Sequence, residues 1–299
     1  MSVTLDAGGG PVESEPPEWA GIMRHYQSLG EHRSGTATDR ETGIWLRSEL
    51  QARGLSAEIR EWPLRLFQLK ESRIESEIGR FDAFPFWYPQ ATGAGGMEAP
   101  LVKADETRNE KLVGSIALFR LPPGQFEFHY HVTPILQQAA ASGAKAAVVI
   151  IDHPLKAVSA QNAAKPHSQE TLPLPAVIAA EADASNLLAL AAGQAVVRLV
   201  IEGIDVSGMA ANVIGRMDRQ ADQWVVVSTP ISGWFEVTNE RGPGIALWLQ
   251  LAHWVVQENL DANFLFAGLS GHELGKLGMD ALVKSGALPK PEKVALWLH

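Results

Sequence analysis

The strongest constraint on the fold comes from a short apolar run that ends at a tight turn. Phe264–Leu269 is apolar throughout, small residues follow it, and apolar residues then recur at helical spacing. Continuous apolar runs are typical of buried strands, and a period near 3.6 is typical of a helix. The stretch therefore predicts a buried parallel strand over 263–269 and a helix over 273–285. His272 and Glu273 lie at the turn between them.

The same alternation of strand and helix runs through the C-terminal third of the chain. Strands are predicted at 211–217, 224–229 and 293–298, with a buried helix over 244–258 that begins in a Gly-Pro-Gly segment. Strands separated by helices imply a mainly parallel sheet with right-handed crossovers. Ligands bind outside the carboxyl ends of strands in such sheets, so the turn after 263–269 is the predicted place for chemistry.

The N-terminal part adds two helices and one strand. The first helix is predicted over 19–29, and a polar loop follows it. Thr38 and Glu41 have the spacing of a capping box, which predicts a second helix that begins there and ends near Gly54. Residues 55–66 alternate between apolar and polar, which indicates an extended strand.

The middle of the chain, residues 70–205, has a different texture. Strand-like segments dominate it, and two helices separate some of them. The predicted strands are 73–78, 112–120, 146–151, 174–179 and 196–202, and the predicted helices are 131–142 and 181–192. This block is therefore predicted to be a β-rich domain inserted into the surrounding α/β domain.

Composition limits the kind of protein. The chain has 299 residues, 46% hydrophobic and 20% charged, which is ordinary for a soluble globular protein. A net charge of −9 argues against nucleic acid and against an anionic membrane as partner. The absence of cysteine excludes disulfides and thiolate ligands. Residues 1–17 are predicted to be a disordered leader rather than a signal peptide, so a cytoplasmic location is expected, and a homo-oligomer is left open.

Several short motifs occur in a specific order and carry a resemblance to a known family. They include HRSGT at 32–36, NVIGRM at 212–217 before WVVVST, and FLFAGLSGHELGKLG at 264–278. Through these, residues 19–66 and 207–299 resemble the zinc-dependent aminopeptidases with two co-catalytic metals, a family that includes glutamate carboxypeptidase-like enzymes. The middle block resembles the protease-associated domain through LVGSIALFR, AAASGAKAAVVII and LPAVIAAEADASNLLAL.

This resemblance implies an α/β fold with two domains. A three-layer aminopeptidase-like domain with a mainly parallel sheet would be formed by 18–69 and 206–299. The protease-associated domain, 70–205, would interrupt it. The sheet is expected to be incomplete at the C-terminus, and whether the stop at His299 is natural or a truncation is left open.

The resemblance also assigns the metal ligands, and most of them differ here. After the strand over 224–229 the family has a His and an Asp, where this sequence has Pro230 and Ser232. The family's bridging Asp aligns with Glu240, one methylene longer. Its general base and the following Glu ligand align with His272 and Glu273.

The next acidic ligand of the family aligns with His299. The resemblance therefore leaves at most one zinc ion, held by Glu240, Glu273 and His299, with His272 as the base that takes a proton from water. A hydrogen-bonded cluster without metal is the alternative for these residues. A serine hydrolase with Ser270 beside His272 is a second alternative, although the surrounding sequence is not a G-x-S-x-G elbow.

Three further residues are candidates for substrate binding. Ser232, Trp234 and Arg241 follow the strand over 224–229, near the predicted cleft. Core packing is the alternative for Trp234, and pairing with a nearby carboxylate is the alternative for Arg241. His129 and His131 would share one face of an extended segment, where they could bind a metal or simply be exposed.

Two functions from different classes follow. The first is a diverged member of the zinc aminopeptidase family, a pseudoenzyme that binds a peptide or related small amide and lacks ordinary two-metal peptidase activity. The second is an active metallopeptidase or amidohydrolase, in which one zinc ion works in a rebuilt site. Fold does not confer function when a site has changed, which favours the first.

Overall fold

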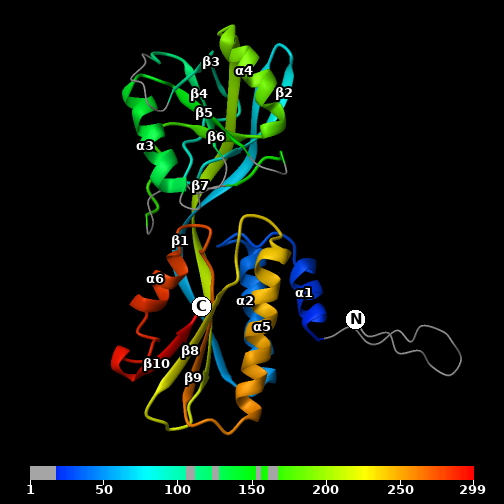
Figure 1. The fold of residues 1–299 in the computed structure, drawn as a ribbon, viewed down its shortest axis with the longest axis vertical. Helices are drawn as coiled ribbons and strands as arrows, with labels where there is room; N and C mark the ends of the chain where they lie inside the picture. The colour runs from blue at the N-terminus through cyan, green and yellow to red at the C-terminus, as the bar shows by residue number, and fades with distance from the viewer. Residues whose placement is uncertain (1–17, 106–111, 123–127, 153–155, 161–167) are drawn as a thin grey trace, which may run out of the picture. The chain divides into compact units, whose positions relative to one another are not determined.

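The computed structural model describes residues 18–105, 112–122, 128–152, 156–160 and 168–299 (Figure 1). The predicted leader, 1–17, lies outside the described residues. Contacts divide the chain into two compact units. Unit 1 comprises residues 18–60, Ala211–Ser270 and Ser285–His299, and unit 2 comprises Glu61–Ala210 and Gly271–Lys284.

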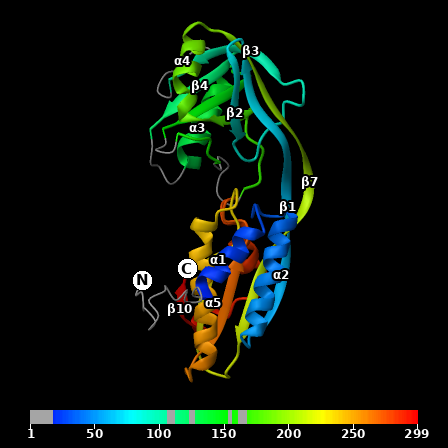
Figure 2. The same ribbon diagram turned by 90° about the vertical axis from the view of Figure 1, so that its right-hand side faces the viewer.

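Unit 1 is a helix-covered sheet. Its elements are α1 (Glu18–Ser28), α2 (Ala37–Ala52), the start of β1 (Ser56–Ser76), the end of β7 (Val196–Met217), β8 (Trp224–Pro230), α5 (Thr238–Gln257), β9 (Asn263–Leu269), the 3₁₀ turn η2 (Pro291–Lys293) and β10 (Val294–Leu298). Helices α1, α2 and α5 share one apolar core with β7, β8 and β9, and Figure 2 shows these helices beside one another.

The sheet of unit 1 has the order β7-β9-β8-β10. Both β9 and β10 run parallel to β8, whereas β7 runs antiparallel to β9. Every residue of β9 is buried, as expected for a strand with neighbours on both sides and both faces covered. The prediction that the strands near 225–229, 264–269 and 294–298 are neighbours in a mainly parallel sheet is confirmed.

Helix α2 begins two residues earlier than predicted, because Thr36 rather than Thr38 is its N-cap. The Thr36 hydroxyl accepts the Asp39 backbone N–H at 3.3 Å, and the Asp39 carboxylate accepts the Gly35 N–H at 2.9 Å. Thr38 instead donates to the carbonyl of Leu29 at 3.4 Å. The Thr36–Asp39 pair satisfies N–H groups at the helix start, which leaves no capping task for Thr38.

We expect Thr36→Ala to lower the free energy of unfolding by about 1 kcal/mol, because the side-chain acceptor at the N-terminus of α2 is lost. Thr38→Ala, a matched change two residues away, should alter it by less than about 0.5 kcal/mol. Urea unfolding followed by circular dichroism measures both values. A larger loss for Thr38→Ala than for Thr36→Ala would show that the cap is assigned to the wrong residue.

Unit 2 is built on the remaining strands of the ten-stranded sheet. Its elements are the rest of β1 and β7, β2 (Gly79–Pro85), β3 (Met97–Lys103), β4 (Ile116–Leu121), α3 (Phe128–Ala141), β5 (Ala146–Ile151), β6 (Ala176–Ala179), the 3₁₀ turn η1 (Glu181–Asp183), α4 (Ala184–Ala192) and α6 (Leu277–Lys284). The strand order is β1-β2-β6-β5-β4-β3-β7. Strands β3 to β6 are parallel, and β2 and β7 pair antiparallel at the two sides.

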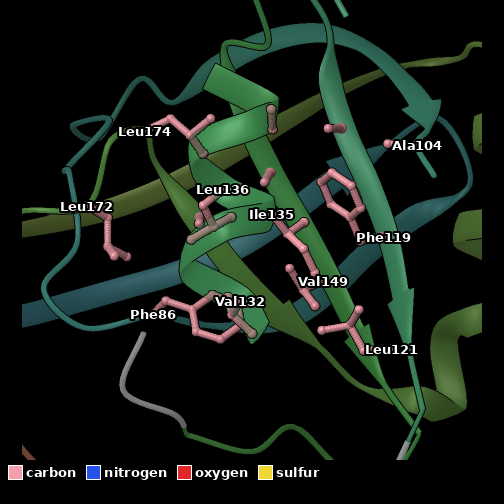
Figure 3. Packing of buried hydrophobic residues seen from close by; sticks show 14 of the residues in the cluster. Phe86, Ala104, Phe119, Leu121, Val132, Ile135, Leu136, Val149, Leu172 and Leu174 are labelled. Atoms are coloured by element: carbon pink, nitrogen blue, oxygen red, sulfur yellow. The ribbon is translucent and has the colours of Figure 1, made fainter. Parts of the chain in front are cut away.

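The core of unit 2 lies between α3 and the parallel strands. Figure 3 shows Ile135 and Leu136 of α3 packed among Phe119 of β4 and Val149 of β5. All residues of β5 are buried, which agrees with its uninterrupted apolar sequence. The prediction of a strand over 146–151 is therefore confirmed to the residue.

Two strands are longer than predicted. β1 continues from 56 to 76 through the segment predicted to separate two strands, and β7 likewise joins 196–202 to 211–217. The two strands pair with each other. Gly203 permits a close approach, since a Cβ there would lie 2.5 Å from the Gln68 carbonyl oxygen. The predicted limits of an inserted domain, 70 and 205, stay a prediction.

Three helix starts also differ from the predictions. α5 begins at Thr238, before the Gly-Pro-Gly segment, because the carbonyl of Val237 accepts the N–H groups of Glu240 and Arg241. α6 begins only at Leu277, after a turn in which Gly271 and Gly275 have positive φ. The segment around His129 and His131 is the start of α3 rather than extended, and the side chains of both lie outside the described residues.

No helix in the part of the chain that the structure describes is long and apolar enough to cross a membrane.

Candidate functional site

Three buried serines meet at the carboxyl ends of β8 and β9. Ser232 lies two residues after β8, Ser270 directly follows β9, and Ser34 comes from the loop between α1 and α2. The Ser270 hydroxyl donates to Ser34 at 2.9 Å, and the Ser34 hydroxyl donates to Ser232 at 3.0 Å. We call Ser34, Ser232 and Ser270 the serine cluster. Its side chains are buried, and the backbone N–H of Ser270 is held by the Asn212 side chain at 3.2 Å.

His32 fixes the loop that carries Ser34. Its Nε2 donates to the Tyr26 carbonyl at 2.9 Å, so Nδ1 is free to accept the Thr42 hydroxyl at 2.9 Å. The imidazole also stacks on the Tyr26 ring, with centroids 3.6 Å apart. Burial lowers the pKa of His32 from 6.5 to about 4. His32 is therefore a neutral structural residue at physiological pH.

The backbone of His32 ties the same loop to the segment after β8. Its N–H donates to the Phe235 carbonyl at 2.9 Å, and its carbonyl accepts the Gly233 N–H at 3.0 Å. The sequence HRSGT thus connects the loop after α1 with the carboxyl end of β8. The serine cluster depends on this connection, because Ser34 and Ser232 lie on the two segments that it joins.

Glu240 and Arg241 lie in the first turn of α5. Glu240 is 60% exposed and pairs with Arg241 at 2.8 Å. The Arg241 side chain is only 10% exposed, and its Nε donates to the Ser232 carbonyl at 2.9 Å. Arg241 therefore supports the backbone beside the serine cluster. Trp234 is half-buried in the segment between β8 and α5.

His299 contacts a different serine. Its Nδ1 lies 2.9 Å from the hydroxyl of Ser228 on β8. The indole N–H of Trp297 donates to the same hydroxyl at 2.8 Å. The Ser228 hydroxyl is thus hydrogen-bonded to residues at the end of β10. Nδ1 of His299 is used in one of these hydrogen bonds.

His272 and Glu273 belong to unit 2 and lie on the turn before α6. The carbonyl of His272 accepts the N–H groups of Gly275 and Lys276, at 3.2 and 3.3 Å. Glu273 is 7% exposed. Burial, followed by the negative charge of Glu273, raises the pKa of Tyr88 above its ordinary value. Because Glu240 and His299 belong to unit 1, a shared site of these four residues stays a prediction.

The side chains that follow β8 do not fit a zinc ion. Protein zinc sites use His, Cys and carboxylate ligands. The side chain of Pro230 has no atom that can bind a metal. Ser232 offers a neutral hydroxyl that is hydrogen-bonded in the serine cluster, and Glu240 is exposed and paired with Arg241. Over the described ranges no three His, Asp or Glu side chains gather as a metal-binding group.

Sequence reasoning missed part of this arrangement. Ser232 and Ser270 were candidates separately, whereas Ser34 and Asn212 were not singled out as site residues. The only signal for Ser34 was its position in HRSGT. The hydrogen bonds join residues 198 and 236 positions apart, and no local pattern reports such a distance.

Similar solved structures are zinc aminopeptidases. BSAP, a zinc aminopeptidase from Bacillus subtilis, is 18% identical and has a TM-score of 0.75 over 93% of this chain and 67% of its own. An aminopeptidase from Aneurinibacillus sp. strain AM-1 is 16% identical, with a TM-score of 0.69 over 93% and 69%. The fold is that of the zinc aminopeptidases.

A peptidase M28 precursor from Shewanella amazonensis has the same fold, with 16% identity and a TM-score of 0.76 over 94% of this chain and 72% of its own. No protein-family model and no curated protein matches the sequence. At these identities the likeness concerns the fold, and the chemistry must be argued from the residues of this chain.

Proposed function

We propose that this protein is a diverged relative of the zinc aminopeptidases that binds a peptide or related amide and lacks ordinary two-metal peptidase activity. The observation that carries the proposal is the serine cluster. It occupies the carboxyl ends of β8 and β9, where open α/β sheets place their ligands. Neutral hydroxyl groups cannot replace a Lewis acid that polarises a carbonyl.

The neighbouring residues suit recognition of a peptide. Arg241 and His32 hold the segment after β8 by its backbone, so Trp234 and Phe235 lie on a fixed segment. Phe235 is 40% exposed and Trp234 is half-buried. Aromatic side chains with exposed area contribute strongly to binding of apolar groups, and we assign them contact with a ligand side chain.

The test is a paired measurement of turnover and binding on the full chain. With zinc added, leucyl and other aminoacyl anilides should be hydrolysed more slowly than about 1 per second, the low end of ordinary enzyme rates. A leucine-containing peptide should bind in calorimetry, and Trp234→Ala should weaken this binding about tenfold by loss of aromatic contact. Trp254→Ala, an exposed tryptophan on α5, is the control.

Two results would reject the proposal. One is turnover above about 1 per second that is abolished both by a chelator and by Glu273→Gln, which would support the single-zinc hydrolase instead. The other is peptide binding that Trp234→Ala and Trp254→Ala weaken equally, which would place the ligand elsewhere.

A further inference from the structure

A second candidate site lies at the carboxyl ends of the parallel strands of unit 2. Lys103 is the last residue of β3, Arg120 is next to last in β4, and Asp152 directly follows β5. The registers of the β3–β4 and β4–β5 pairs bring these three ends to the same edge of the sheet. This is the edge at which open α/β sheets bind ligands.

A surface cavity of about 410 Å³ opens at this edge. Lys103, Asp105, Arg120 and Asp152 supply its polar lining, and Leu188 of α4 is part of its apolar wall. A volume of this size suits a small molecule or the last residues of a peptide.

The charged side chains of the cavity differ in whether they form ion pairs within the chain. The Nε of Arg120 donates to Asp152 at 2.8 Å, and its guanidinium also lies 3.7 Å from Glu181. Asp152 is therefore neutralised by a guanidinium that is held in place. Lys103 is exposed and makes no ion pair or side-chain hydrogen bond within the described residues. Among the described residues its ammonium is therefore a positive charge of the cavity without an ion-pair partner.

The geometry points to a carboxylate-binding site that takes the C-terminal end of a short peptide. The Lys103 ammonium binds the carboxylate, with the fixed Arg120 guanidinium beside it. An ionised carboxylate accepts several hydrogen bonds, so Asp105 can accept a peptide N–H in addition to its contact within the chain, which favours a peptide over a simple acid. Leu188 receives an aliphatic side chain. The inference concerns unit 2 alone and does not depend on the function proposed for unit 1.

The experiment uses the full chain and two probes that differ in one group. Acetyl-Ala-Leu has a free carboxylate, and its C-terminal amide has none. Titration of the ¹⁵N-labelled protein should shift the amide signals of Lys103, Leu121 and Asp152 with the acid only. Lys103→Ala should weaken binding of the acid about tenfold, the size expected for one charge-assisted hydrogen bond.

Lys145→Ala is the matched control. Lys145 is also exposed, but it lies just before β5, at the amino ends of the same parallel strands. Unchanged binding in this variant, together with the loss in Lys103→Ala, is the expected result. Equal binding of acid and amide, equal loss in the two variants, or absence of shifts at the three named amides would overturn the inference.

Discussion

Trp248→Ala is expected to lower the free energy of unfolding of unit 1 by about 4 kcal/mol, the middle of the range for loss of a buried tryptophan. Trp248 is 2% exposed on the inner face of α5, and its ring meets Phe266 of β9 edge-on with centroids 5.9 Å apart. Its indole N–H donates to the Val227 carbonyl of β8 at 3.1 Å. The substitution would therefore leave a cavity between the helix and the sheet and also remove a buried hydrogen bond.

The same helix supplies the control. Trp254 is 49% exposed, so Trp254→Ala removes the same side chain from the same helix with little loss of buried area. We expect it to change the free energy of unfolding by less than about 1 kcal/mol. Urea unfolding followed by far-ultraviolet circular dichroism gives both values without relying on tryptophan fluorescence. Similar losses in the two variants would mean that α5 does not pack on the sheet through Trp248.

The strands that the sequence predicted best are those in which every residue is buried. β5 and β9 are buried along their whole length, and each is a continuous apolar run between small or polar residues. Apolar character alone then sets both the type of element and its ends. The parallel neighbours β8 and β10 followed from the alternation with helices.

The elements predicted poorly depend on contacts between distant residues. β1 and β7 are hydrogen-bonded to each other. Each therefore stays extended through a segment in which the apolar and polar residues do not alternate regularly. The sequence offers two possible capping pairs for α2, Thr36 with Asp39 and Thr38 with Glu41. The geometry of the preceding loop determines which pair reaches the free N–H groups at the helix start. Local propensity does not contain that information.

The candidate site shows the same division. The sequence placed chemistry at the ends of β8 and β9 and identified Ser232 and Ser270 among the residues there. It did not identify Ser34, which is hydrogen-bonded to both of these serines. Ser34 lies in the loop before α2, far from them in the sequence, so no local pattern links it to the strand ends. For Arg241 the sequence offered pairing with a nearby carboxylate as well as substrate binding. The structure shows the pairing, with Glu240 at 2.8 Å, and adds a hydrogen bond from Nε to the Ser232 carbonyl that no local pattern reports.

His32 predicts how stability depends on pH. Its imidazole is buried, and its hydrogen-bond partners are the Tyr26 carbonyl and the Thr42 hydroxyl rather than a carboxylate. Burial lowers its pKa to about 4 in the folded protein, against 6.5 for an unperturbed histidine. The unfolded chain therefore binds the proton more tightly than the folded chain. The contribution of His32 is complete above about pH 6.5 and is lost as the pH falls from there to about 4.

The size of the loss follows from the difference between the two pKa values. Each pKa unit corresponds to about 1.4 kcal/mol, so the shift to about 4 limits the loss to about 3 kcal/mol. Carboxylates elsewhere also take up protons over the lower part of this range, so the pH profile of the native chain alone does not isolate His32. A variant that lacks the imidazole does isolate it.

His32→Gln is expected to be less stable than the native chain at pH 7, since it disturbs the contacts to Tyr26 and Thr42. The gap between the two chains should narrow by up to about 3 kcal/mol between pH 6.5 and pH 4, because only the native chain loses the His32 contribution there. His253→Gln, an exposed position on α5, should follow the native profile throughout. If urea unfolding gave parallel profiles for the native chain and His32→Gln, the imidazole would be protonated equally in both states. The loop that carries Ser34 would then be open to water rather than closed over a neutral histidine.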